Sequence, residues 1–225
     1  MVKKRQITDT ALPLLPTTSN WLELSTLSNQ PGLIAGVDEV GRGALFGPVV
    51  AAAVILPQSA FSELITAGIN DSKKLSPLRR SVLADQICAI ACDWRIGFAS
   101  TAEIDQLNIL YASLLAMKRA VLKLSVQPTL CLIDGNHCVN GLPMSQKTII
   151  KGDSLSVAIA AASIVAKVWR DDLICRLAIN YPQYDLARNK GYGSQRHLLA
   201  IQEYGVTRLH RKSFSPCQNN IRSQE

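Results

Sequence analysis

The sequence lacks the features that would assign it to a membrane or to an oxidising compartment. None of its six cysteines forms a C-x-x-C pair, and the basic start MVKKRQITDT is not followed by the apolar stretch of a secretory signal. The longest uncharged core stretch, residues 154–166, is too short to cross a bilayer. We therefore expect a cytoplasmic protein with reduced cysteines and no membrane partner.

A zinc site is not favoured either. Cys131, His137 and Cys138 are close in the sequence, but their spacing fits no common zinc pattern. Small buried hydrophobic side chains are the better interpretation of these cysteines.

Size and composition predict one folded domain that binds an anionic partner. The 225 residues are 48% hydrophobic, which is enough for a substantial core, and the net charge of +7 favours nucleic acid. We expect an N-terminal arm over residues 1–30, with a short helix around residues 21–27. The folded domain then covers residues 31–216 and ends in a helical segment, and a polar, frayed tail covers residues 217–225.

Residues 33–56, LIAGVDEVGRGALFGPVVAAAVIL, contain the first candidate site. Two apolar runs predict buried strands, with Asp38 and Glu39 at the end of the first and a glycine-rich turn between them. Successive strand side chains point to opposite faces, so both acids serve one site only if the chain leaves strand geometry near Glu39. Buried unpaired charge is costly, and three explanations stay open: a divalent cation, pairing with basic side chains, or solvation in a loop.

Hydrophobic periodicity and capping residues predict the remaining elements. Ser76, Ser100 and Ser194 are expected N-caps, and Glu103 completes a capping box with Ser100. The predicted helices cover residues 77–90, 101–121, 154–179 and 195–204, and the predicted strands cover 94–99, 130–133 and 148–150. Small residues in the first half of the 154–179 helix allow it to lie close to a sheet. A tight turn predicts an antiparallel first pair of strands, and helical connections predict parallel later strands, giving a mixed sheet with helices on its faces.

Acids follow three of the predicted strands. Besides Asp38 and Glu39, Asp134 comes directly after the apolar run 130–133, and Asp153 follows the run 148–150 after Lys151 and Gly152. Sites in open α/β sheets form at strand ends, and clustered carboxylates repel one another unless hard cations such as Mg²⁺ or Mn²⁺ bind them. Two such ions, about 3.5–4 Å apart, activate a water and stabilise the leaving oxygen in phosphodiester cleavage. Asp153 has an alternative as an N-cap, and Asp134 has one in a turn with Gly135.

Taken together, the motifs resemble bacterial ribonuclease HII. They occur in that family's order over residues 33–216: GVDEVGRGALFGPVVAAAVIL, NDSKKLS, LIDGN, KGDS with AASIVAKVWRD, KGYG and HRKSF. The resemblance implies an α/β, ribonuclease H-like fold: a mixed five-stranded sheet, with three antiparallel strands plus parallel strands, flanked by helices and followed by a helical C-terminal part.

The resemblance also implies an activity. It implies a metal-dependent endonuclease that cuts the RNA strand of RNA–DNA hybrids and incises 5′ of ribonucleotides embedded in duplex DNA. The products carry 3′-hydroxyl and 5′-phosphate ends, the cofactor is Mn²⁺ or Mg²⁺, and the cellular context is DNA replication and repair. We expect a monomer, and a contact with a sliding clamp is not readable from the sequence.

The family's functional residues fall on specific positions of this chain. Its metal-site acids fall on Asp38, Glu39, Asp134 and Asp153, its substrate-reading turn on Gly41, Arg42 and Gly43, and its junction-sensing tyrosine on Tyr192. A flat ring can pack on a deoxyribose face and would be crowded by a 2′-hydroxyl, which separates DNA from RNA. An ordinary loop tyrosine is the alternative for Tyr192. The candidate phosphate contacts are Arg42, Lys73, Lys74, Lys151 and Lys167, each of which has a solvated side chain as its alternative.

The resemblance does not place a histidine in the metal site. His137, His197 and His210 are not needed as metal ligands, and His210 is either structural or in contact with product. Asn189 stands where a histidine is common in the family.

Three rival functions remain in view. A dehydrogenase or kinase would explain a glycine turn after a strand, but neither the dinucleotide fingerprint nor a Walker motif is complete. A non-catalytic nucleic-acid binder would explain the charge but not the acids. A junction resolvase-like nuclease of the same fold is opposed only by the Gly41–Gly43 turn and Tyr192.

Overall fold

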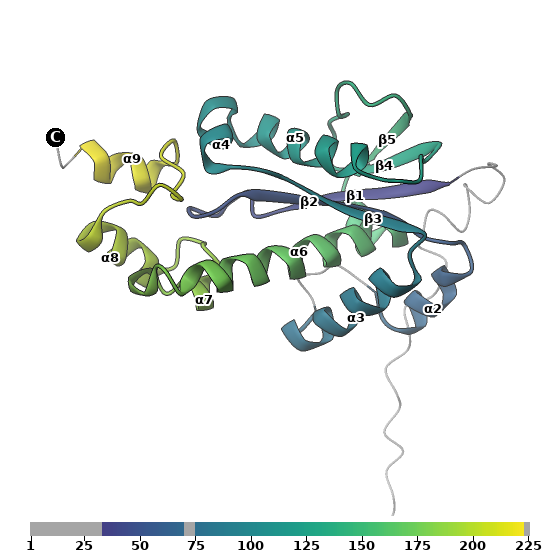
Figure 1. The fold of residues 1–225 in the computed structure, drawn as a ribbon, viewed down its shortest axis with the longest axis horizontal. Helices are drawn as coiled ribbons and strands as arrows, with labels where there is room; N and C mark the ends of the chain where they lie inside the picture. Colours follow the sequence, from purple (N-terminus) through teal and green to yellow (C-terminus); the bar gives the residue numbers. More distant parts are fainter. Residues whose placement is uncertain (1–32, 70–74, 223–225) are drawn as a thin grey trace, which may run out of the picture.

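The computed structural model describes residues 33–69 and 75–222, and the side chains up to residue 218 (Figure 1). The predicted N-terminal arm, its short helix, and Lys73 and Lys74 lie outside the described residues. Among the described residues, no helix combines the length and apolar character that a membrane span requires.

A mixed sheet forms the centre of the molecule. Its strands lie in the order β3-β2-β1-β4-β5. The first three pair antiparallel, whereas β4 and β5 run parallel to β1, which confirms the predicted five-stranded mixed sheet. The strand bounds are β1 Ile34–Val40, β2 Val49–Ile55, β3 Asp93–Ala99, β4 Leu130–Asp134 and β5 Ser145–Ile149.

Helices cover both faces of the sheet (Figure 1). The helices α4 and α5 lie on one face, α2, α3 and α6 lie on the other, and α7, α8 and α9 gather at one end of the molecule. The bounds are α2 Ala60–Thr66, α3 Pro77–Ile90, α4 Thr101–Leu107, α5 Ile109–Leu122, α6 Val157–Ala178, α7 Leu186–Asn189, α8 Gln195–Tyr204 and α9 Ser215–Arg222, with short 3₁₀ turns η2 Gly152–Ser154 and η3 Pro182–Tyr184.

Helix α6 lies directly on β1 because neither element has bulk at the contact. A Cβ atom added at Gly36 would lie 2.1 Å from the carbonyl carbon of Ala158, so only glycine fits there. The first half of α6 is buried and rich in small residues, as predicted for this helix. Gly97 has the same role on β3, where an added Cβ would lie 2.1 Å from the Ala116 carbonyl oxygen of α5.

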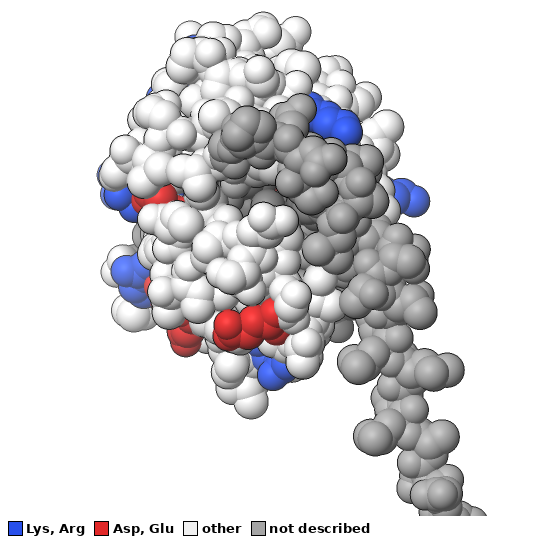
Figure 2. Space-filling view, turned by 90° about the vertical axis from the view of Figure 1, so that its right-hand side faces the viewer, with Lys and Arg blue, Asp and Glu red and all other residues white. Residues whose placement is uncertain are grey.

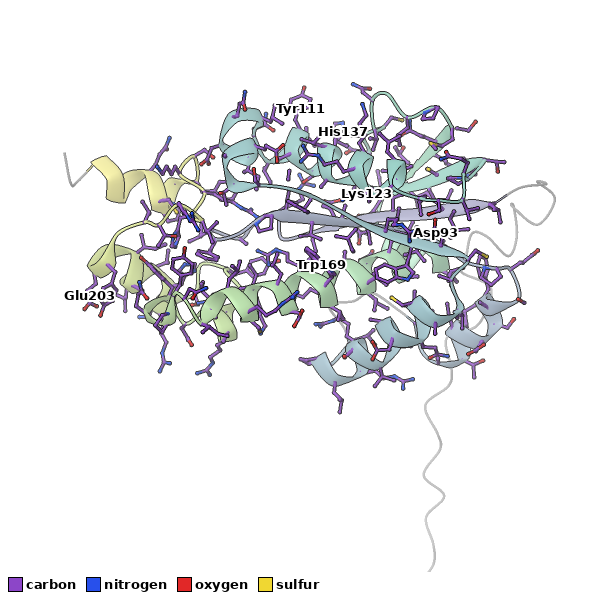
Figure 3. The ribbon with its side chains drawn as sticks, in the orientation of Figure 1. Asp93, Tyr111, Lys123, His137, Trp169 and Glu203 are labelled. Carbon is purple, nitrogen blue, oxygen red and sulfur yellow. The ribbon has the colours of Figure 1, made fainter. Side chains whose placement is uncertain are left out.

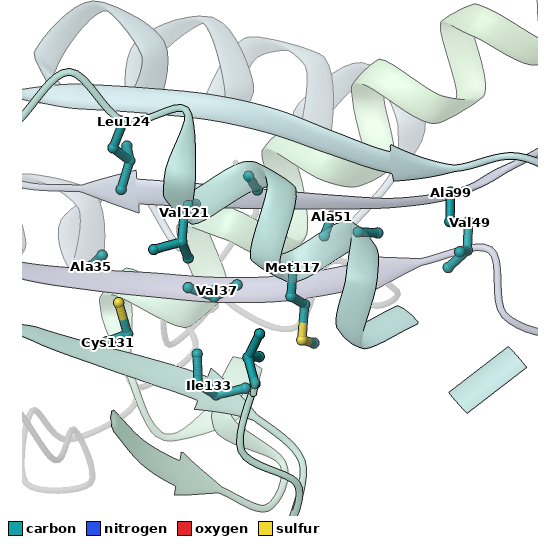
Figure 4. Close-up of a cluster of buried hydrophobic side chains, with 14 of the residues drawn as sticks. Ala35, Val37, Val49, Ala51, Ala99, Met117, Val121, Leu124, Cys131 and Ile133 are labelled. Atoms are coloured by element: carbon teal, nitrogen blue, oxygen red, sulfur yellow. The ribbon is translucent and has the colours of Figure 1, made fainter. Parts of the chain in front are cut away.

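Three of the four hydrophobic clusters among the described residues account for most of this packing. One fills the space between the sheet and α3 and α6, and a second fills the α5 side, where Val37, Met117 and Ile133 meet (Figure 4). The third joins the C-terminal helices to the chain just after β1, through Phe46 and Tyr184. The C-terminal helical part is therefore anchored beside the end of β1.

Several boundaries differ from the predictions. The single helix expected over 101–121 is wrong, because Asn108 adopts a φ of 69° and divides it into α4 and α5. Its side chain then caps α5 by accepting from the amides of Leu110 and Tyr111. The helix predicted from residue 154 begins at Val157, with Ser156 as its N-cap, so the N-cap alternative for Asp153 is wrong. Strand β5 also begins and ends earlier than the predicted strand over 148–150.

The predicted N-caps are confirmed. Ser76 and Ser194 each accept a hydrogen bond from the third residue of their helix, and Ser100 and Glu103 form the full capping box. Helices α2, α7 and α9 were not predicted. Helix α9 covers much of the expected polar tail, because Cys217 is fully buried in the third cluster and anchors it.

The cysteines divide between interior and surface. Cys131 and Cys217 are buried, as expected for small hydrophobic side chains, and all six are free. The same interpretation is wrong for Cys138, which is exposed.

Candidate active site

Three carboxylates from two neighbouring strands converge beside β1. Ligand oxygens of Asp38, Glu39 and Asp134 all lie within 4.8 Å of one another. Within the part of the chain that the structure describes, they are the one group of acidic, histidine or cysteine side chains arranged closely enough to share a metal ion.

The strand geometry that brings them together differs from the expectation. Asp38 and Glu39 stay paired with Ala52 and Ala51 of β2, so the prediction that the chain leaves strand geometry near Glu39 is wrong. The pairing of β4 with β1 stops at Val37 and Ile133, which leaves the β4 side of β1 open beyond that point. Asp134 ends β4 next to this open edge, and its carboxylate lies within 4.8 Å of those of Asp38 and Glu39.

Backbone amides hold two of the carboxylates. The Glu39 amide donates to Asp38 Oδ1 at 2.7 Å, and the Gly152 amide donates to Asp134 Oδ1 at 2.7 Å. Gly152 belongs to η2, whose preceding residue Lys151 adopts a left-handed φ of 58°. Asp134 therefore ties the η2 turn, and with it Asp153, to the end of β4.

Burial makes the ionised forms of these acids costly. Burial raises the pKa of Asp38 well above its usual value, the charges of Glu39 and Asp134 raise it further, and a hydrogen bond with Ser163 opposes the shift. Burial also raises the pKa of Glu39, although Arg42, at 3.2 Å, opposes that shift. A site that concentrates negative charge in this way favours a bound cation.

The acids line a cleft of about 420 Å³. Most of the predicted site residues surround it: Asp38, Glu39, Gly41, Arg42, Gly43, Asp134, Asp153, Lys167 and Tyr192. Asp153 lines this cleft but is not one of the three acids that lie within 4.8 Å. Lys151 is exposed and is not one of the residues that line the cleft.

Two buried arginines that sequence analysis missed hold the glycine turn from inside. Arg211 donates to the carbonyl oxygens of Gly41 and Arg42, both at 2.6 Å, and to that of Gly47 at 3.0 Å. Burial, together with the charge of Arg170, lowers the pKa of Arg211 to about 9. Backbone carbonyls rather than acids therefore supply the hydrogen-bond acceptors for this guanidinium.

Arg170 completes this support. It donates to the carbonyl oxygens of Pro48, Lys190 and Phe46 at 3.0–3.1 Å. Arg170 and Arg211 lie inside the AASIVAKVWRD and HRKSF motifs, but nothing local in those motifs shows that their side chains turn inward.

Tyr192 lies beside the glycine turn. It forms an isolated β-bridge with Ala44, and its ring has Lys167 Nζ and Arg170 Cζ each 5.5 Å from the centroid. Lys167 also pairs with Asp171 at 2.9 Å. The tyrosine ring, a lysine and the glycine turn thus share the rim of the acidic cleft.

The histidines take no part in the acidic group. His137 is exposed and lies on the same side of the sheet as α5 (Figure 3). His197 and His210 are buried against each other, with their Nε2 atoms 3.1 Å apart.

Comparisons with known proteins agree with the geometry. The family model described as Ribonuclease HII matches residues 35–217. The Ribonuclease HII of Trichormus variabilis is 63% identical over 223 residues, covering 98% of this chain and 99% of that protein. A structure of the ribonuclease H2 from Pyrococcus horikoshii has a TM-score of 0.75 at 24% identity, covering 85% of this chain and 98% of that one.

A more distant fold relative is the structure of Bst-RNase HIII in complex with Mn²⁺. Its TM-score is 0.67 at 18% identity, and the match covers 86% of this chain and 70% of that one. The family match spans the strands, the acidic group, the glycine turn and the C-terminal helices described above. The chain therefore belongs to the ribonuclease HII family and is a type II ribonuclease H.

Proposed function

We propose that this enzyme cuts the RNA strand of RNA–DNA hybrids and incises 5′ of single ribonucleotides embedded in duplex DNA, using Mn²⁺ or Mg²⁺. The observation that carries the proposal is the group of three carboxylates within 4.8 Å, opening into a cleft that Gly43 and Tyr192 also line. Such an activity serves the removal of ribonucleotides from DNA during replication and repair.

The residues present fit a divalent cation. Asp38, Glu39 and Asp134 offer oxygen donors, with Asp153 on the same cleft, and an all-oxygen set selects Mg²⁺ or Mn²⁺. Their burial raises the pKa of Asp38 and Glu39, and a cation would offset the cost of their charges. The Mn²⁺ complex of the related RNase HIII fold supports the same chemistry.

The chain's own groups hold the donors in place. The amides of Glu39 and Gly152 orient the carboxylates of Asp38 and Asp134, so neither side chain has to be ordered during the reaction. Ions held by Asp38, Glu39 and Asp134 would supply the activation of the attacking water and the stabilisation of the leaving 3′-oxygen. Arg42 fixes Glu39, while about half of its own side chain stays exposed at the rim, where it can meet a phosphate.

Selectivity comes from the rim of the cleft. A Cβ atom added at Gly43 would have no atom within 4 Å, so a sugar can approach the backbone closely there. The Tyr192 ring packs against the next sugar, which is accepted as deoxyribose and crowded by a 2′-hydroxyl. Four lysines contact the phosphates on either side of these sugars: Lys73, Lys74, Lys151 and Lys167.

The end of the molecule where β1 begins carries charges of both signs. Figure 2 shows small groups of basic and acidic side chains there, some of them next to one another, among uncharged described residues. That end presents no continuous basic surface in its described part. The basic groups that act on the substrate are those around the cleft, and affinity should fall steeply as salt rises.

A cleavage assay tests the proposal. A labelled DNA duplex with one ribonucleotide is incubated with Mn²⁺, Mg²⁺ or a chelator, and the products are resolved on a sequencing gel. We expect a single cut 5′ of the ribonucleotide with either ion and none with chelator. Cleavage that persists in chelator would refute the metal site, and a protein that cuts an all-RNA hybrid but leaves this duplex intact would refute the embedded-ribonucleotide activity.

The matched control is Asp134→Asn. The amide oxygen can still accept from the Gly152 N–H, so η2 stays in place, but one negative donor is lost. We expect cleavage to fall by more than about 100-fold while hybrid binding is retained. Unchanged turnover would remove Asp134 from the site.

A further inference from the structure

A chain of hydrogen bonds runs through two buried histidines to the backbone of Tyr192. The Thr207 amide lies 2.9 Å from His210 Nδ1, and His210 Nε2 lies 3.1 Å from His197 Nε2. His197 Nδ1 then lies 2.9 Å from the Tyr192 carbonyl oxygen. The imidazoles are 0% and 1% exposed and do not line the acidic cleft, so they are available neither to the acidic group nor to solvent.

The two ends of this chain determine where its hydrogens lie. A backbone amide only donates, so His210 Nδ1 accepts from the Thr207 amide and the hydrogen of this imidazole is on Nε2. The Thr207 hydroxyl also lies 2.9 Å from Nδ1, and because a hydroxyl can donate it is compatible with this assignment. A carbonyl oxygen only accepts, so His197 Nδ1 donates to Tyr192 and its Nε2 carries a lone pair. The two assignments agree at the contact between the rings, where His210 Nε2–H donates to His197 Nε2.

The surroundings keep both rings neutral. Burial lowers the pKa of His210 to about 3, with a further contribution from His197, and burial also lowers the pKa of His197. A proton added to His197 would place two N–H groups against each other across 3.1 Å, and one added to His210 would face the Thr207 amide across 2.9 Å. The rings of Tyr184 and Phe46 pack edge-on against His210, with centroids 4.8 Å and 5.1 Å away, and they exclude water from the chain. Hydrogen bonds in such a dry interior are strong and directional.

Tyr192 depends on restraints from outside its own loop. Gly191 and Gly193 flank it, and Gly191 has a φ of 83°, so the local backbone has wide conformational freedom. Its carbonyl accepts from the Ser194 amide at 2.8 Å as well as from His197. The link through His197 ties this carbonyl to a buried ring in another part of the core.

The same histidine chain also reaches the segment that follows the glycine turn. His210 forms an isolated bridge with Phe46, and Leu45 donates to the Gly191 carbonyl at 2.8 Å. The position of Tyr192 relative to the turn is therefore held by direct backbone contacts with Ala44 and Leu45 and, in addition, by the chain through His197 and His210.

We propose that His197 and His210 are positioning residues that hold the Tyr192 ring over the sugar at an RNA-to-DNA junction and so determine how strongly the enzyme prefers that junction. The inference rests on the proposed function, because it assumes that Tyr192 senses the junction. Two buried histidines that are remote from the reacting atoms would then contribute to the selectivity for the junction.

The test measures kcat/KM on a strand with one RNA-to-DNA junction and on an all-RNA hybrid. His197→Phe keeps an aromatic ring in the core but removes both hydrogen bonds. We expect the ratio of junction to all-RNA cleavage to fall about fivefold to tenfold, the range that corresponds to one lost hydrogen bond. His197→Asn, whose amide nitrogen can take the place of Nδ1, should recover part of the ratio.

Two further variants separate positioning from a general structural role. Tyr184→Phe removes a buried 2.9 Å hydrogen bond to the Gly205 carbonyl in the same cluster, and the ratio should stay unchanged. In a Tyr192→Ala background, His197→Phe should no longer alter the ratio, because the residue through which it acts is absent. An equal change with Tyr184→Phe, or a further loss in the Tyr192→Ala background, would overturn the inference.

A measurement on the unmodified enzyme does not depend on any variant folding. Long-range ¹H–¹⁵N spectra at pH 7 should show two neutral rings, with the hydrogen on Nδ1 of His197 and on Nε2 of His210. A charged ring or the opposite tautomers would overturn the inference. Wild type without junction preference would overturn the proposed function and this inference together, whereas a preference that survives His197→Phe overturns the inference alone.

Discussion

Gly41 and Gly43 of the glycine turn should respond in opposite ways to the same methyl group. Gly41 has a φ of 88°, and a Cβ atom there would lie 2.1 Å from Arg170 Nε. Gly43 has no atom within 4 Å of its Cβ position, and its φ is not positive. Gly41→Ala is therefore a perturbation of the fold, and Gly43→Ala is a perturbation of the space that the substrate enters.

The cost of Gly41→Ala follows from these contacts. A left-handed backbone costs alanine about 1–2 kcal/mol. Arg170 must also move, and losing one of its charge-assisted hydrogen bonds to a buried carbonyl costs about 1.5–3 kcal/mol. A less flexible unfolded chain returns about 0.4–1 kcal/mol. The expected net loss of stability is roughly 2–4 kcal/mol, which lowers Tm by roughly 5–15 °C for a domain of this size.

Urea unfolding and cleavage kinetics distinguish the two variants. Gly41→Ala should unfold at a clearly lower urea concentration than wild type. Gly43→Ala should keep or slightly raise the unfolding midpoint, while KM on the hybrid rises about tenfold or more because the methyl group occupies the approach of the sugar. A wild-type midpoint for Gly41→Ala, or a loss of stability in Gly43→Ala with unchanged KM, would refute the reasoning.

Three other substitutions test separate parts of the structure. Asp38→Asn removes a buried charge, so in chelator the variant should unfold at a higher temperature than wild type. Added Mn²⁺ should raise Tm in wild type only. An equal rise of Tm in both proteins would contradict the cation site. Arg119 holds the pKa of Glu103 at about 2, so the stability that Glu103 adds is present above its unfolded pKa of about 4.3 and is lost as pH falls towards 2. Glu103→Gln should remove that pH dependence and about 1 kcal/mol, a small value because the pair is partly exposed, and urea midpoints between pH 2.5 and 6 measure it. Ser113 Oγ is buried without a hydrogen-bond partner among the described residues, so Ser113→Ala should raise the free energy of unfolding by about 1 kcal/mol, and a decrease would show that the hydroxyl has a partner.

Local chemistry made much of this fold predictable. Three helices carry a start signal within four residues, and each begins at that signal: Ser76 followed by Pro77, Ser100 paired with Glu103, and Ser194. The Asn108 break escaped detection because apolar residues continue at helical spacing on both sides of it. No glycine or proline marks the place, and Asn108 combines its positive φ with an extended ψ of 167°, a strained conformation that the side-chain cap on α5 helps to hold.

The acids were predictable as a set, but their geometry was not. Glu39 reaches its neighbours because β4 stops pairing with β1 at Val37, and the length of one strand relative to another is a property of the folded sheet. The support that Arg170 and Arg211 give to the glycine turn was not predictable, for a related reason. Arginine is usually exposed, and the carbonyl oxygens that these residues bind lie up to 170 positions away in the chain.

That separation has a consequence for how the protein is made. Translation proceeds from the N-terminus, and β1 and the turn that follows it leave the ribosome long before Arg211. Until that guanidinium arrives, the carbonyls of Gly41, Arg42 and Gly47 lack the donor that shapes the turn. A nascent chain can thus pair β1 with β2 early, but the turn between them gains its buried support only after Arg211 has been made.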